Sequence, residues 1–177
     1  MSRPSGQITD TEPLEFWEYE LIIAKLEPHW QLFYALLWET GIRVSEALKL
    51  TRKDFENMGV YVIRSKRKDH LRDHLPLSLG LFSRFRLLFQ LTRMQRVFPY
   101  TASAAWLALK RACKAAGVRE SIHPHSFRHG LGFRLRREGY DIAVVQRALG
   151  QKDMHSTERY FKATLGEIEA ALRKVNT

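Results

Sequence analysis

The sequence predicts a mainly α fold with one small antiparallel β-hairpin or sheet, which places it in the α+β class. Apolar residues recur at helical spacing through most of the 177 residues, and two β-rich runs flank a single charged turn. Hydrophobic residues make up 45% of the chain and aromatic residues 11%, enough for a packed core. This length suits one substantial domain, so we expect residues 1–177 to form a single domain.

Three helices are expected before the sheet. Pro13 is suited to the first helical position of PLEFWEYELIIAKL, residues 13–26, because a missing N–H costs nothing there. A second helix covers PHWQLFYALLWET, residues 28–40, and Gly41 is suited to the left-handed conformation that ends many helices. RVSEALKL, residues 43–50, favours a short third helix.

The β-rich runs predict a hairpin. They are GVYVIRS, residues 59–65, and HLRDHLPLS, residues 70–78, on either side of the charged turn KRKD. A third short strand would fit beside them.

Helical patterns resume after the hairpin. In HSFRHGLGFRLRREG, residues 125–139, Phe127, Leu131 and Leu135 recur every four residues, and Ser126 is suited to capping the N-terminus. The helices expected in this half cover residues 81–91, 101–117, 125–139, 141–150, 154–161 and 165–175.

Positive charge is concentrated in the middle of the chain. Residues 1–41 hold two basic and seven acidic side chains, whereas residues 42–162 hold 25 basic and 10 acidic ones. An excess of fifteen positive charges in one region predicts a strongly basic face and a nucleic acid as the partner.

Cysteine content and the apolar runs exclude other classes. The only cysteine, Cys113, allows neither an internal disulfide nor a cysteine-based zinc site. The N-terminal MSRPSGQITD lacks the apolar core of a signal peptide, and no apolar run approaches the length of a membrane span. These features predict a cytoplasmic protein.

Four fragments carry candidate catalytic groups in order along the chain. They are GIRVSEALKL with Arg43, IRSKRKD with Lys66 and Lys68, HPHSFRHG with His125 and Arg128, and LGQKDMHSTERY with Tyr160. Together these residue types can perform a transesterification at a phosphodiester without a metal ion. Two guanidiniums grip the non-bridging oxygens, and a helix N-terminus adds its dipole. A tyrosine attacks phosphorus, a histidine accepts its proton, and a lysine protonates the departing oxygen.

Each residue taken singly has a simpler explanation. Arg43 could pair with Glu39 or Glu46 on a helix surface, and the hairpin lysines could be a solvated turn. His125 could be a capping or core histidine. The prediction therefore rests on the ordered set.

The ordered set resembles the catalytic domain of the tyrosine recombinase, or phage integrase, family over roughly residues 9–165. TGIRVSEALKL is similar to that family's first arginine motif, and HSFRH to its H-x-x-R-H box. The resemblance implies these roles: Arg43 and Arg128 as phosphate clamps, Glu46 as a supporting acid, Lys66 or in reserve Lys68 as the catalytic lysine, His125 as a catalytic histidine, His129 as a structural neighbour, and Tyr160 as the nucleophile.

Gln151 departs from the family pattern. The family usually has a histidine, sometimes a tryptophan, at this position after LG. A glutamine amide can still donate a hydrogen bond to a phosphate oxygen but cannot titrate. His155, four residues on, could supply that donor instead.

The implied activity is site-specific recombination of double-stranded DNA through a 3′-phosphotyrosyl intermediate, with neither cofactor nor metal. TLGEIEAALRKVN predicts an amphipathic helix with Leu165, Ile168 and Leu172 on one face. The family resemblance implies that this helix docks on a neighbouring subunit in a synaptic tetramer. The chain has no room for the family's usual N-terminal core-binding domain. It is therefore expected to be either an excised fragment or a natural single-domain member.

Three alternatives stay open at this point. A type IB topoisomerase-like enzyme would use the same chemistry to relax DNA. A DNA-binding relative without catalysis would account for Gln151 as a sign of decay. A metal-dependent nuclease would use His123, His125 and His129, but the sequence offers no evident carboxylate cluster beside them.

Overall fold

A computed structural model describes residues 12–64 and 71–151. Its elements follow in the order α1 (Phe16–Lys25), α2 (Pro28–Thr40), α3 (Val44–Ala47), the 3-10 turn η1 (Arg52–Asp54), β1 (Phe55–Glu56), β2 (Gly59–Ile63), β3 (Arg72–Pro76), α4 (Leu79–Leu91), α5 (Ala102–Ala116), α6 (Pro124–Arg137) and α7 (Ile142–Leu149). The strands form an antiparallel sheet in the order β1-β2-β3. The predicted α+β class is therefore confirmed, and the third short strand is β1. Within the described ranges, no helix is both long and apolar enough to cross a membrane.

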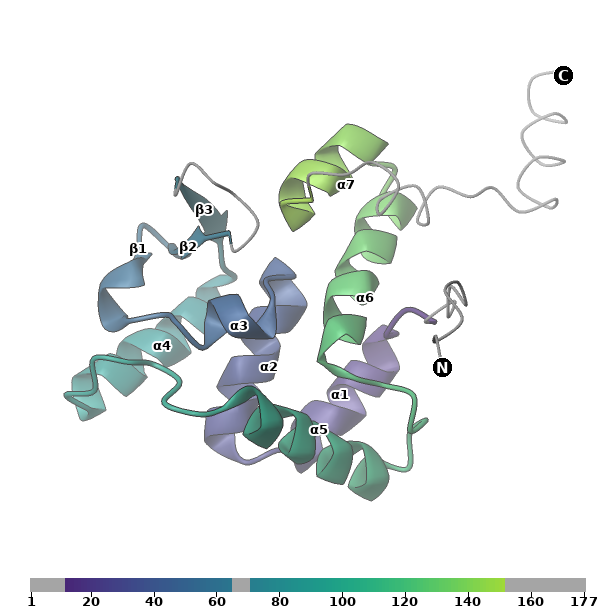
Figure 1. The fold of residues 1–177 in the computed structure, drawn as a ribbon, viewed down its shortest axis with the longest axis horizontal. Helices are drawn as coiled ribbons and strands as arrows, with labels where there is room; N and C mark the ends of the chain where they lie inside the picture. The colour runs from purple at the N-terminus through teal and green to yellow at the C-terminus, as the bar shows by residue number, and fades with distance from the viewer. Residues whose placement is uncertain (1–11, 65–70, 152–177) are drawn as a thin grey trace, which may run out of the picture. The chain divides into compact units, whose positions relative to one another are not determined.

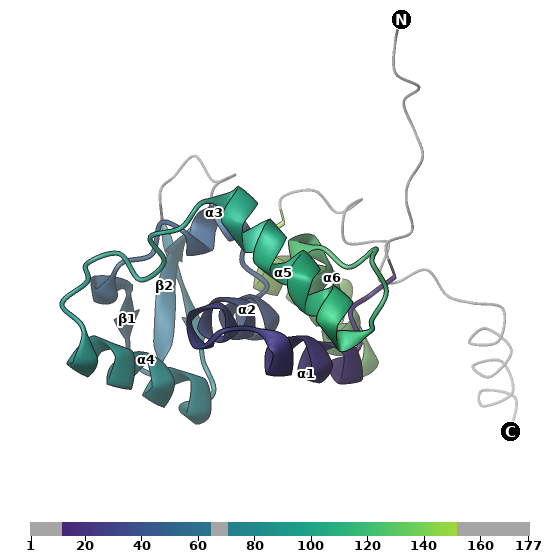
Figure 2. The same ribbon diagram turned by 90° about the horizontal axis from the view of Figure 1, so that it is seen from below.

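The chain divides into two compact units, residues 1–131 and 132–177. In the first unit, α2 lies between two groups of elements, as Figure 1 and Figure 2 show. On one side are the sheet and α4, and on the other are α1 and α5, which pack against each other. Helix α6 begins in the first unit and ends in the second.

The core of the first unit is built around α2. This helix is apolar on nearly all sides, as expected for a buried helix, and Phe33 and Leu36 are fully buried. The Tyr34 hydroxyl donates a hydrogen bond to the Ala105 carbonyl at 2.6 Å, and burial raises the pKa of that hydroxyl far above its usual value. The ring centroids of Tyr34 and Phe127 are also 4.9 Å apart. Helix α2 thereby positions the start of α6.

The sheet is attached to the same core through α4. The register of β2 and β3 pairs Gly59 with Pro76 and Ile63 with Arg72. Phe55 of β1 is buried, and its ring centroid lies 4.4 Å from the ring centroid of Phe85 in α4. The hairpin predicted from the β-rich runs is confirmed, while the turn that carries its lysines lies outside the described residues.

The N-termini of α1 and α6 differ from the sequence prediction. The first helix begins at Phe16 rather than at Pro13, because Glu15 has an extended backbone and its N–H donates to the Glu18 carboxylate at 3.0 Å. Ser126 does not precede α6, which begins at Pro124. Its hydroxyl instead accepts a hydrogen bond from the backbone N–H of His123 at 3.2 Å.

Two other predicted boundaries have mixed outcomes. Gly41 does end α2 in the left-handed conformation, with φ 61°. The helix expected over residues 43–50 is shorter, since α3 spans only Val44–Ala47.

Two glycines in helices provide a matched test of packing. A Cβ at Gly130 of α6 would lie 2.8 Å from the backbone oxygen of Leu14, whereas a Cβ at Gly80 of α4 would meet nothing within 4 Å. Gly130→Ala should therefore lower the free energy of unfolding by about 1–3 kcal/mol through overpacking. Gly80→Ala should be neutral or raise it by up to about 1 kcal/mol. Urea unfolding midpoints measure both, and equal shifts in the two variants would contradict the close approach of α6 to Leu14.

Candidate functional site

Arg43 is held by Glu46 at both its backbone and its side chain. The Arg43 backbone N–H donates to Glu46 Oε2 at 2.9 Å, and Arg43 Nη1 donates to Glu46 Oε1 at 2.9 Å. The side chain of Glu46 is 0% exposed and that of Arg43 is 19% exposed. The acid therefore lies inside the protein and the guanidinium reaches its surface, which differs from a pair of solvated side chains on a helix face.

Arg128 reaches from α6 to the connection between α2 and α3. The residue is buried, and its Nη1 donates to the backbone carbonyl of Gly41 at 2.7 Å. Gly41 lies two residues before Arg43 in the chain. Arg128 is thus bonded to the short segment that contains Arg43. The two arginines predicted as phosphate clamps, far apart in the sequence, are connected through this segment.

The two histidines of HSFRH have different surroundings. His125, near the start of α6, is exposed, whereas His129 is 6% exposed. Their ring centroids are 4.9 Å apart with an edge-on arrangement. This geometry fits an accessible His125 that could exchange a proton and a His129 that packs beneath it.

His123 lies further from this pair and is partly buried. Its ring centroid is 6.5 Å from that of His125, and burial, with a smaller contribution from the nearby Lys110 cation, lowers the pKa of its imidazole. Among the residues that the structure describes, no group of three or more His, Cys, Asp or Glu is arranged to hold a metal ion.

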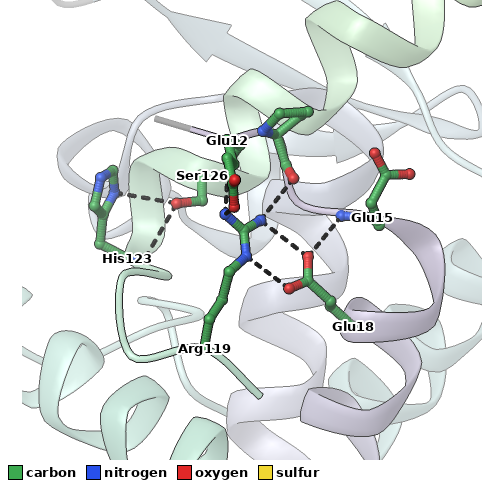
Figure 3. A network of polar contacts seen from close by, with 7 residues as sticks. Glu12, Glu15, Glu18, Arg119, His123 and Ser126 are labelled. Atoms are coloured by element: carbon green, nitrogen blue, oxygen red, sulfur yellow. Dashed lines mark hydrogen bonds and ion pairs between the residues drawn. The ribbon is translucent and has the colours of Figure 1, made fainter. Parts of the chain in front are cut away.

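The loop before α6 is held to the N-terminal segment by Arg119. Its Nε and Nη2 donate to the two carboxylate oxygens of Glu18 at 2.7 and 3.0 Å. Nη2 also donates to the Pro13 carbonyl at 2.7 Å, and Nη1 to Glu12 Oε2 at 2.8 Å. Figure 3 shows this guanidinium surrounded by acceptors from the segment just before α1 and from α1 itself. The hydrogen bonds to Glu18, with smaller contributions from the negative charges of Glu18, Glu12 and Glu15, raise the pKa of Arg119.

The same loop is also held to α5. Lys110 Nζ donates to the Ile122 carbonyl at 2.8 Å and to the Glu120 carbonyl. The loop therefore has anchors on two sides just before the helix that carries His125 and Arg128. Arg119 and Lys110 were not predicted as part of the site, because nothing in the sequence distinguishes them from other cations of a basic region.

Four predicted site residues lie outside the described residues: Lys66, Lys68, His155 and Tyr160. Gln151 is described and belongs to the second unit, directly after Gly150, which ends α7 with φ 57°. Its backbone N–H donates to the Gln146 carbonyl at 3.0 Å. The catalytic roles of these five residues stay predictions, as do those of the other predicted site residues.

Sequence comparisons identify relatives over most of the chain. Residues 13–166 match the model of the Phage integrase family. Tyrosine recombinase XerC of Rickettsia prowazekii is 27% identical over 147 residues, which cover 76% of this chain and 47% of that protein. Tyrosine recombinase XerA of Thermococcus kodakarensis is 30% identical over 155 residues, covering 81% and 54%. The chain thus spans about half the length of the curated relatives it matches.

Solved structures share the fold. The Tn1549 transposon integrase in complex with transposon right end DNA superposes with a TM-score of 0.79 at 17% identity, covering 98% of this chain and 69% of that one. The catalytic domain of bacteriophage HP1 integrase gives a TM-score of 0.68 at 22% identity, covering 91% and 93%.

The Arg119 anchor has a measurable effect on stability. Arg119→Met removes the cation beside Glu18, which is 3% exposed, so it should lower the free energy of unfolding by about 2–4 kcal/mol. The double change Arg119→Met with Glu18→Leu should recover much of that loss, because no unpaired charge is then buried. Arg111→Met, at an exposed position of α5, is the control and should cost less than about 0.5 kcal/mol. Equal urea midpoints for Arg119→Met and Arg111→Met would contradict the anchor.

Proposed function

The chain belongs to the phage integrase family, and we propose that it cleaves and rejoins double-stranded DNA as a site-specific tyrosine recombinase. The observation that carries the proposal concerns the short segment between α2 and α3. Arg43 lies in this segment and is held by Glu46, and Arg128 is bonded to the Gly41 carbonyl of the same segment. Two fixed guanidiniums can bind the non-bridging oxygens of one phosphate as negative charge builds up on them. The strongly basic central region supports binding to a polyanion.

The proposed first step is an attack by Tyr160 on the scissile phosphate. The tyrosine oxygen forms a bond to phosphorus, and its proton passes to His125, which is exposed at the start of α6. The bond from phosphorus to the 5′ oxygen breaks, and Lys66 donates the proton that this oxygen needs. Gln151 donates a further hydrogen bond to a non-bridging oxygen.

The proposed second step reverses the first with a different strand. The 5′-hydroxyl of a partner strand attacks the phosphotyrosine and releases Tyr160. The phosphodiester bond energy is kept in the intermediate, so the reaction needs no ATP. The XerA and XerC relatives are named tyrosine recombinases, and the Tn1549 integrase was solved with DNA. These names support the same substrate class for this chain.

Recombination requires paired sites, so the proposal includes self-association on DNA. The predicted amphipathic helix after Tyr160, with Leu165, Ile168 and Leu172 on one face, would dock on a neighbouring subunit of a tetramer. This docking would couple cleavage to assembly.

Covalent trapping tests the proposal and the nucleophile. A suicide DNA substrate loses a short 5′-hydroxyl fragment after cleavage, so the protein should stay attached to the 3′ end. Tyr160→Phe should abolish the adduct but leave DNA binding nearly unchanged, because affinity comes mainly from phosphate neutralisation. Tyr140→Phe, at an exposed tyrosine of the described chain, is the control and should form the adduct normally.

The outcomes of the trapping experiment separate the alternatives. A wild-type protein that binds DNA but forms no adduct would be a relative without catalysis. An adduct that relaxes supercoiled DNA but never exchanges strands between paired sites would indicate a topoisomerase-like enzyme. Cleavage that disappears in EDTA would indicate a metal-dependent nuclease.

A sulfur-substituted substrate tests the choice between Lys66 and Lys68. A 5′-bridging phosphorothiolate has a leaving group that needs no proton. Lys66→Ala should therefore fail to cleave a normal phosphodiester, with a loss of about a hundredfold or more, yet cleave the phosphorothiolate well. Lys68→Ala is the matched control and should cleave both. Rescue of Lys68→Ala instead would transfer the role to that residue.

A further inference from the structure

Arg64 is a buried arginine next to the candidate site. It follows β2 directly, and its side chain is 0% exposed. Its Nε donates to Asp73 Oδ2 of β3 at 3.1 Å, and its Nη1 lies 3.7 Å from Glu46 Oε2. Arginine is almost never fully buried unless it is paired, and here the guanidinium is hydrogen-bonded to the Asp73 carboxylate and forms a longer ion pair with that of Glu46.

The carboxylate of Glu46 lies between two arginines. Its Oε1 accepts from Arg43 Nη1 at 2.9 Å, while its Oε2 accepts from the Arg43 backbone N–H and is also in contact with Arg64. Since Arg64 is hydrogen-bonded to Asp73, a continuous line of charges runs from the guanidinium of Arg43 through Glu46 and Arg64 to the sheet.

Glu46 is held locally by the two hydrogen bonds from Arg43, within a very short helix. Helix α3 has four residues, Val44–Ala47, and helices this short have little stability of their own. The contact with Arg64 gives the Glu46 carboxylate a second attachment, on the sheet. A buried ion pair adds little to stability compared with apolar residues of similar volume. Stability therefore does not explain why the pair of Arg64 and Glu46 is found next to Arg43.

We propose that Arg64 is a positioning residue for Arg43. Arg64 holds the Glu46 carboxylate against the sheet. Glu46 in turn holds the Arg43 guanidinium in the orientation that binds a scissile phosphate. The proposal rests on the proposed function for its chemistry. Arg64 acts through Glu46, because the Glu46 carboxylate lies between its guanidinium and that of Arg43.

The first test compares cleavage of two suicide substrates by Arg64→Met. One has a normal scissile phosphate. The other has a methylphosphonate, in which a methyl group replaces a charged non-bridging oxygen and leaves less charge for Arg43 to stabilise. Arg43→Ala, the reference, should lose about a hundredfold on the phosphate and clearly less on the methylphosphonate. Arg64→Met should show the same selective loss, at least about tenfold on the phosphate.

Two further variants sharpen this test. Arg64→Lys should recover part of the loss, because an ammonium keeps the charge but cannot match the planar guanidinium. Arg72→Met removes a cation of the same sheet that is 46% exposed and pairs with Asp54, and it should cleave both substrates as the wild type does. An equal loss of Arg64→Met on both substrates would assign Arg64 a purely structural role, and unchanged cleavage would remove any role.

The second test needs neither cleavage nor DNA. In ¹⁵N spectra at low temperature, a fixed guanidinium gives separate Nη signals and a rotating one gives an averaged signal. Arg43, identified with Arg43→Lys, should have separate signals in the wild type and in Arg72→Met but an averaged one in Arg64→Met. If Arg64→Met does not fold, Arg64→Lys is measured in its place and should show partial averaging.

Together the two tests distinguish a failure of the proposed function from a failure of the positioning role. A wild-type protein without an adduct overturns the proposed function, while the spectra still report on Arg43. Separate Arg43 signals in both Arg64→Met and Arg64→Lys overturn the positioning role, whatever the activity.

Discussion

A charge inside a protein must be paired, and this requirement determines how the candidate site is assembled. Glu46 is buried between Arg43 and Arg64, Arg128 is buried against the Gly41 carbonyl, and Glu18 is buried against Arg119. Burial of any of these groups without its partner would be strongly unfavourable. The pairing therefore specifies one arrangement among the many that would bury the apolar side chains about equally well.

The pair of Arg43 and Glu46 is local, but the other three contacts join segments that are distant in the sequence. Arg128 connects α6 to the end of α2, Arg64 connects the sheet to α3, and Arg119 connects the loop before α6 to the N-terminal segment. The apolar core around α2 gives the first unit its stability, but a core of this kind tolerates small shifts of its elements. Directional contacts of charged groups fix the orientation of the side chains at the surface above it.

Local patterns predicted much of this fold from the sequence. The apolar spacing and Gly41 predicted α2, and the β-rich runs predicted the hairpin. The family resemblance implied that Arg43 and Arg128 act at one phosphate, and Arg128 is bonded to Gly41, two residues before Arg43; the catalytic roles stay predictions. Long-range pairing was not predictable. Arg64 ends the β-rich run on the same face as Val60 and Val62, but the sequence does not show which carboxylates would pair with it there. The start of α1 was wrong because the Glu15 and Glu18 hydrogen bond, rather than Pro13, decides where the helix begins.

The attachment of Arg119 to the carbonyl of Pro13 and to the side chain of Glu12 has a mechanical consequence. Tension applied to the chain at Glu12 does not load α1 alone. The guanidinium transmits part of it to the loop before α6, and Lys110 transmits it further to α5. A pull on Glu12 is thus felt at the first turn of the helix that presents His125, so the segment before α1 and the candidate catalytic helix are mechanically coupled.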